Sequence, residues 1–66
     1  MTNYLALAAE SIYIRAGYER GQAFTQGKVV AEYLVAHLEE CRRQFNVDDE
    51  LELVRMLALA MVGARA

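Results

Sequence analysis

LELVRMLALAMV, residues 51–62, decides the fold of this chain because it is apolar almost without interruption. Wound as a helix at about 100° per residue, its apolar side chains cover more than half of the circumference. Only Glu52 and Arg55 mark a polar stripe, with Leu59 between them. A helix that is apolar on nearly every side is normally buried, and 66 residues offer little mass to bury it. We therefore expect another molecule to cover part of this helix.

The length of the chain limits how much stability its own core can supply. A domain of this size hides only about 60% of the surface that its unfolded chain exposes. Cys41 is the only cysteine and His37 the only histidine, so neither a disulfide nor a metal is expected to add support. Oligomerisation remains, and a hydrophobic fraction of 56% favours it. We expect one helical domain over residues 1–66 that associates as a homodimeric helical bundle.

The fold class predicted is all-α. Proline is absent, so helix ends must come from glycine, asparagine and capping side chains. The apolar spacing predicts a protomer of three helices, over about 3–20, 25–45 and 48–63. The first helix is expected to begin with Thr2 or Asn3 as its N-cap.

Three glycines in eleven residues mark the end of the first helix. Because glycine costs nearly 1 kcal/mol relative to alanine inside a helix, Gly17, Gly21 and Gly27 predict a break or kink between Arg20 and Gly27. Thr25 would then be the N-cap of the second helix. The alternative is that the first two segments form one kinked helix.

The second helix is expected to be amphipathic and to end in a short turn. Its buried stripe is Val30, Leu34, Leu38, Cys41 and Phe45, which repeat at helical spacing. Asn46 is the expected terminator, because asparagine tolerates the left-handed conformation, and Asp48 is the expected start of the last helix. So short a turn predicts that the last two helices lie antiparallel or at a steep angle and share a core.

Two surfaces of the chain are candidates for interaction. The last helix is expected to provide the self-association interface, formed by Leu51, Val54, Leu57, Ala58 and Met61. On the first helix, one apolar stripe can pack internally while another stays free for a twin subunit or a foreign protein. The predicted partner-binding residues are Leu7, Ile14, Arg15, Tyr18 and Arg20, of which tyrosine and arginine are types enriched in interface hot spots. The alternative is that the tyrosines only rim the core, with their hydroxyls in water.

Few residues are candidates for chemistry. His37 and Cys41 are four positions apart and could form half of a metal site, but a closed zinc site needs four ligands, so a symmetric partner would have to supply the rest. A buried inert thiol and an edge-of-core histidine are the more ordinary interpretation. Glu39 and Glu40 diverge by about 100° around the helix and cannot act as a paired acid and base. We predict no catalytic residues, no bound metal and no cofactor.

Charge and size together indicate a function class. Nine acidic and seven basic residues give a net charge of -2, without the clustered basic footprint of a nucleic-acid binder. We expect a non-catalytic protein–protein interaction module: a small helical homodimer that inhibits, occludes or chaperones a larger protein, as many phage and mobile-element regulators do. The alternative is a small helix-turn-helix transcription regulator that uses the turn at Phe45 to Asp48. Against it, the last helix lacks the polar and basic side chains that read base edges.

The location expected from the sequence is the cytoplasm. The first residues, MTNYLALAAE, lack the positive leader and the uninterrupted apolar segment of a secretory signal. The C-terminal apolar run is too short to span a bilayer. A weaker alternative, an interfacial membrane helix over residues 51–65, is disfavoured because its polar stripe carries Glu52 as well as Arg55.

Overall fold

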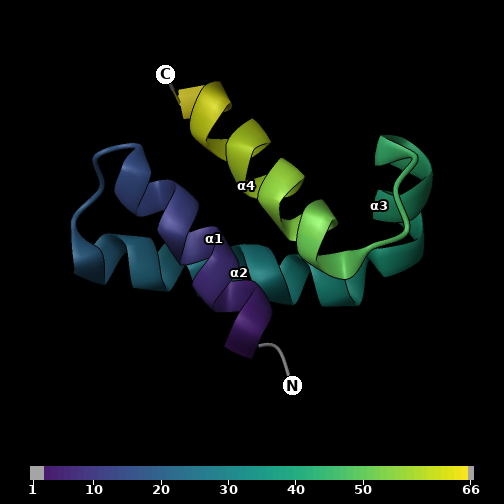
Figure 1. Cartoon of the computed structure of the whole chain (residues 1–66), viewed down its shortest axis with the longest axis horizontal. Coiled ribbons are helices and arrows are strands. Elements are labelled where there is room, and N and C mark those ends of the chain that lie inside the picture. The colour runs from purple at the N-terminus through teal and green to yellow at the C-terminus, as the bar shows by residue number, and fades with distance from the viewer. Residues whose placement is uncertain (1–2, 66) are drawn as a thin grey trace.

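In a computed structural model, which describes residues 3–65, the chain forms four helices (Figure 1). They are α1 (Asn3–Arg15), α2 (Arg20–Ala36), α3 (Leu38–Phe45) and α4 (Glu50–Arg65). The predicted all-α class is confirmed, but the division into three helices is wrong, because the segment predicted as the second helix is two helices. The expected N-cap at Thr2 lies outside the described residues.

The first helix break lies earlier than predicted. Helix α1 ends at Arg15, residues 16–19 form the turn, and Gly17 adopts a φ of +100°, which a side chain would strongly disfavour. The predicted break between Arg20 and Gly27 is wrong, as is the single kinked helix. Thr25 lies inside α2 and is not an N-cap, since its hydroxyl donates to the Gly21 carbonyl at 3.0 Å.

Gly27 is a packing residue and not a helix breaker. A Cβ at this position would lie 2.7 Å from the carbonyl oxygen of Ala6 and 2.9 Å from the amide nitrogen of Glu10, both on α1. Ala23 and Ala31, one turn before and one turn after Gly27, are fully buried. Helix α1 therefore crosses α2 almost backbone to backbone, and this contact outweighs the low helix propensity of glycine.

A second break, at His37, separates α2 from α3. The backbone of His37 leaves the helical region, with φ -125° and ψ 35°. The predicted apolar stripe nevertheless faces inward: Val30, Leu34 and Cys41 are buried, and Leu38 and Phe45 pack half-buried against the core. The periodicity thus identified the buried face, although it did not locate the break.

The turn between α3 and α4 is close to the predicted one. Asn46 ends α3 in the left-handed conformation, with φ 59° and ψ 43°, which confirms it as the terminator. Helix α4 begins at Glu50, two residues later than predicted, because Asp49 and not Asp48 is the cap. Its Oδ2 accepts a hydrogen bond from the Glu52 amide at 2.9 Å.

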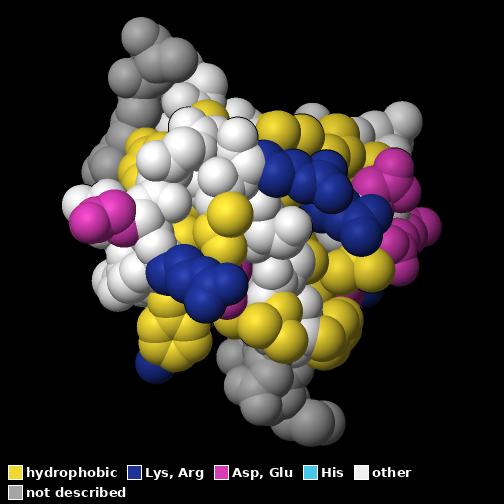
Figure 2. Space-filling view, turned by 60° about the vertical axis from the view of Figure 1, so that its left-hand side comes forward, with side chains coloured by type: hydrophobic (Ala, Val, Ile, Leu, Met, Phe, Trp, Pro, Cys, Tyr) yellow, Lys and Arg dark blue, Asp and Glu magenta, His cyan; other side chains and the backbone are white. Residues whose placement is uncertain are grey.

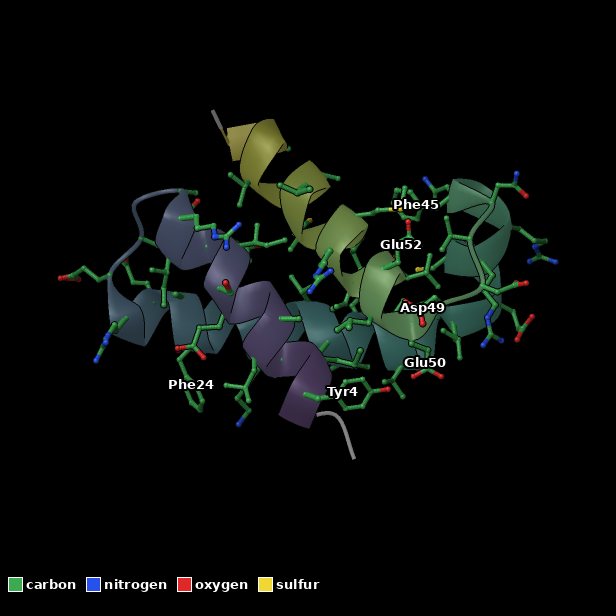
Figure 3. All side chains as sticks on the ribbon, viewed as in Figure 1. Tyr4, Phe24, Phe45, Asp49, Glu50 and Glu52 are labelled. Atoms are coloured by element: carbon green, nitrogen blue, oxygen red, sulfur yellow. The ribbon has the colours of Figure 1, made fainter. Side chains whose placement is uncertain are left out.

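The helices form a flat molecule whose Cα atoms span 31 × 27 × 15 Å. Helices α1 and α4 lie side by side across one face of α2 and run in the same direction, while α3 lies at the far end (Figure 1). The Tyr4 hydroxyl donates to Glu50 Oε1 at 3.1 Å and joins the starts of α1 and α4 (Figure 3). The core between the helices consists of Leu5, Ala9, Tyr13, Ala23, Val30, Ala31, Leu34, Cys41, Leu53, Val54 and Ala58.

Candidate interaction surfaces

The C-terminal half of α4 leaves two large apolar side chains exposed. Residues 56–64 carry no charge, and the end of the helix that they form extends away from α2 (Figure 1). Leu59 is 58% exposed and Met61 44% exposed, although their side chains point about 200° apart around the helix. The fold therefore shelters the first half of α4 and leaves the second half open on more than one side.

The residues predicted for self-association divide between core and surface. Val54 and Ala58 are fully buried inside the protomer, and Leu51 and Leu57 are half-buried against its core. Met61 is the member of this set whose side chain is exposed. The sequence could not separate them, because which side of α4 is covered depends on where α1 and α2 pass.

One side of the exposed half of α4 borders a groove between α2, α3 and α4. We call it the apolar groove; its volume is about 350 Å³, and no charged residue lines it. Met61 on α4 and Val29 and Tyr33 on α2 are about half exposed, while Leu57 and Phe45 are half-buried. The full lining is Val29, Val30, Tyr33, Cys41, Gln44, Phe45, Leu57, Ala60 and Met61.

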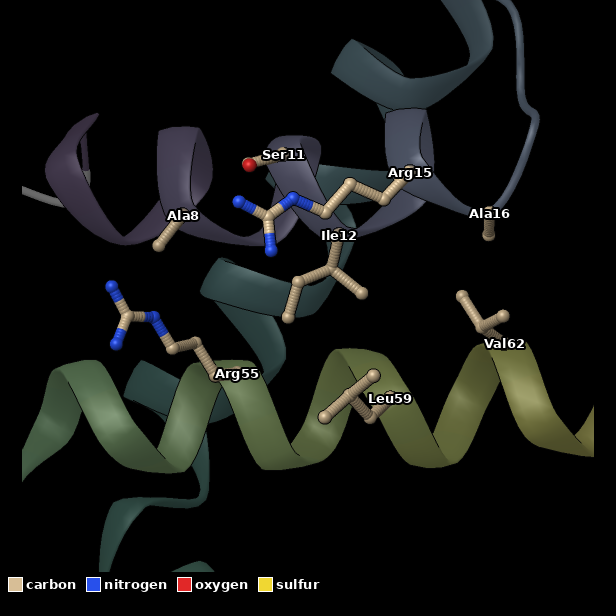
Figure 4. Close-up of a pocket in the computed structure, with 8 residues that line it drawn as sticks. All are labelled: Ala8, Ser11, Ile12, Arg15, Ala16, Arg55, Leu59 and Val62. Atoms are coloured by element: carbon tan, nitrogen blue, oxygen red, sulfur yellow. The ribbon is translucent and has the colours of Figure 1, made fainter.

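The other side of α4 borders a groove against α1, which we call the arginine groove (Figure 4). Its volume is about 600 Å³, and its lining is Ala8, Ser11, Ile12, Arg15, Ala16, Arg55, Leu59 and Val62. The base consists of half-buried Ala8, Ile12 and Val62, whereas the side chains at the rim are exposed. The groove thus combines an apolar base with two positive charges.

The residues predicted for partner binding lie on two neighbouring parts of the surface. Leu7, 62% exposed, and Ile14, 42% exposed, lie on the outer side of α1, and Arg15 joins this side to the arginine groove. Tyr18 is half-buried, and its ring meets the Tyr13 ring edge to face, with 5.0 Å between the ring centroids. Arg20 is exposed at the start of α2.

The sequence reasoning missed the second arginine of the groove. Arg55 was noted only as part of the polar stripe of α4, yet it lines the same groove as Arg15. No spacing rule connects these positions, because they lie on different helices far apart in the sequence. Only the parallel packing of α1 and α4 brings them together.

His37 and Cys41 have different surroundings. His37 is exposed at the α2–α3 break, with Nδ1 3.2 Å from Glu40 Oε1 and its ring 4.3 Å from the Tyr33 ring. Cys41 is 3% exposed, and burial, with a smaller effect of the Glu40 charge, raises the pKa of its thiol. A raised pKa lowers the thiolate fraction at neutral pH and makes the thiol a poor nucleophile. Among residues 3–65, no group of three or more His, Cys, Asp or Glu side chains is placed so that it could hold a metal ion.

The chain matches no protein-family model, no curated protein and no solved structure. No helix within residues 3–65 combines the length and the apolar character that crossing a bilayer requires. The class that the structure defines is a small all-α protein with one open groove on each side of its last helix.

Proposed function

We propose that this protein is a non-catalytic protein–protein interaction module, a homodimer that binds a larger protein and modulates it by covering part of its surface. The observation that carries the proposal is the uncharged half of α4, where Leu59 and Met61 stay exposed and each borders a groove. Other exposed apolar side chains, such as Phe24 and Val35, line neither groove. Exposed apolar side chains that border grooves are typical of interaction sites.

The apolar groove is the proposed self-association surface. A twofold dimer uses the same surface on both subunits, so Met61 of one chain would enter the groove of the other while its own groove receives the second Met61. The uncharged lining favours this, because no like charges would be brought together. An interface of standard size buries about 800 Å² per subunit, a substantial part of the 4567 Å² surface of this chain.

A charge placed at Met61 tests the dimer. We expect size-exclusion chromatography with light scattering to give a dimer for the parent chain and a monomer for Met61→Lys, because burying an unpaired ammonium is too costly. Val35→Lys is the matched control, since Val35 is 51% exposed on α2 and lines neither groove. A parent chain that stays monomeric at high concentration, or a Met61→Lys variant that dimerises like Val35→Lys, would contradict the proposal.

The helix-turn-helix alternative gains no support from the side chains of α4. The turn over residues 46–49 is short enough, but the first turns of α4 present Glu50, Glu52 and Arg55, of which two repel phosphate. Retention of the protein on duplex DNA at low salt would favour this alternative. We expect no retention.

A further inference from the structure

Arg15 and Arg55 hold two positive charges at one end of the arginine groove. Both side chains turn toward the Ala8–Ser11 end, while Ile12, Leu59 and Val62 lie toward the other end (Figure 4). The space-filling view of this side shows basic side chains next to each other between hydrophobic ones (Figure 2). The groove is thus basic at one end and apolar at the other.

Neither guanidinium is neutralised within the described residues. No carboxylate of residues 3–65 lies within 4.0 Å of Arg15 or Arg55. Arg42, in contrast, pairs with Glu39 at 2.8 Å. Two adjacent guanidiniums without a carboxylate repel each other and offer several donors to an anion. Charge complementarity therefore calls for an acidic group at this end of the groove.

We infer that the arginine groove binds an amphipathic helix of a partner protein, with a carboxylate against Arg15 and Arg55 and apolar side chains over Ile12, Leu59 and Val62. The inference rests on the proposed function, because it specifies the partner. The groove follows about two helical turns of α1 and α4, from Ala8 to Ala16 on one side, so an acidic residue and apolar residues four and seven positions away would match its two ends. A third helix laid between two parallel ones is an ordinary packing arrangement.

The open shape of the groove favours a helix over a small amphiphilic anion. Ser11, Arg15, Ala16, Arg55 and Leu59 are all exposed, so nothing closes over the groove. A single acyl chain lying there would keep much of its surface in water, whereas small-molecule sites usually bury about 70–90% of their ligand. A helix needs only one face covered.

A pair of charge-matched peptides tests the inference on the full chain. One helical peptide carries Glu and, four and seven positions later, two leucines on one face; the second has Lys in place of the Glu. We expect fluorescence anisotropy to show binding of the Glu peptide, weakened by added salt, and at least about tenfold weaker binding of the Lys peptide.

The charge-reversed chains Arg15→Glu and Arg55→Glu test the same contact from the other side. Their affinity for the Glu peptide should fall by a similar factor, and their affinity for the Lys peptide should rise. Circular dichroism should show unchanged helicity, because both arginines are exposed.

Arg43→Glu is the control variant, because Arg43 is exposed on α3 and lines neither groove. It should bind the Glu peptide like the parent chain. Equal binding of the two peptides, no binding of either, or an Arg15→Glu chain that binds like Arg43→Glu would overturn the inference. So would stoichiometric binding of dodecanoate in place of the peptides, since the occupant would then be a small amphiphile. Light scattering on the same samples reports the dimer separately, so failure of the peptide test and failure of self-association can be told apart.

Discussion

At the scale of single residues, Gly27 sets the distance between α1 and α2. Alanine is the better helix former by about 1 kcal/mol, so Gly27→Ala would be stabilising if only local propensity mattered. The added Cβ would lie 2.7 Å from the Ala6 carbonyl oxygen, a backbone atom that cannot turn aside. Overpacking of this kind costs about 1–3 kcal/mol. Because the clash is with backbone, we expect a cost in the upper part of this range, which exceeds the gain in helix propensity. Urea unfolding should show a net loss of about 1–2 kcal/mol.

Gly21→Ala is the matched control for this substitution. Gly21 lies in the same helix, and a Cβ added there would meet nothing within 4 Å. This change should be neutral or stabilising by up to about 0.5 kcal/mol. If Gly27→Ala were as stable as Gly21→Ala, the close crossing of α1 and α2 would be wrong.

Cys41 is a residue whose burial has a consequence for pH dependence. Its thiol pKa is raised mainly by desolvation, so the neutral thiol is the form that the folded chain favours. This contribution to stability is present below the unfolded-state pKa of about 8.5 and is lost as the pH rises through the folded-state pKa. The rate of Cys41 alkylation by iodoacetamide should therefore reach half of its maximum at a higher pH in the folded chain than in the urea-unfolded chain. A half-maximal rate at the same pH as in the unfolded chain, or at a lower pH, would contradict the burial of the thiol.

At the scale of helices, the start of α4 depends on one side chain. Asp49→Ala removes the acceptor for the Glu52 amide and should cost about 1 kcal/mol. Asp48→Ala is the control, because only the backbone carbonyl of Asp48 makes a hydrogen bond, from Arg42 Nε at 3.3 Å, and the variant should stay within about 0.5 kcal/mol of the parent. Thermal unfolding compares the two variants. Equal effects would mean that Asp49 does not cap α4.

The helices also show which parts of the fold sequence reasoning can reach. The turn at Asn46 was predictable because its cause is local: a residue that tolerates positive φ stands between two amphipathic segments. The helical role of Gly27 was not predictable, because it depends on the position of Ala6 and Glu10 on another helix. The break at His37 carries no glycine or proline signal at all.

The candidate site follows the same division between local and tertiary causes. The excess of apolar side chains on α4 was predictable from residues 51–62, and Leu59 and Met61 are indeed exposed. The two grooves were not predictable from the sequence, since each depends on how α4 lies against α1 or α2. Val54 and Ala58 were therefore grouped with Met61 for self-association, although only Met61 faces outward.

At the scale of the whole molecule, the central proposal is that a second chain covers the exposed half of α4. The methyl group of Met61 reports this directly, because Met61 is 44% exposed in the isolated protomer and borders the apolar groove. With methionine methyls labelled with carbon-13, a soluble gadolinium chelate broadens the signals of those methyls that solvent reaches.

We predict that the Met61 methyl is protected from the chelate at near-millimolar chain concentration and becomes accessible on dilution to low micromolar concentration, as mass action requires of a dimer. The signal is assigned by its loss in Met61→Leu. Equal and full accessibility of the Met61 methyl at both concentrations would contradict the proposed dimer.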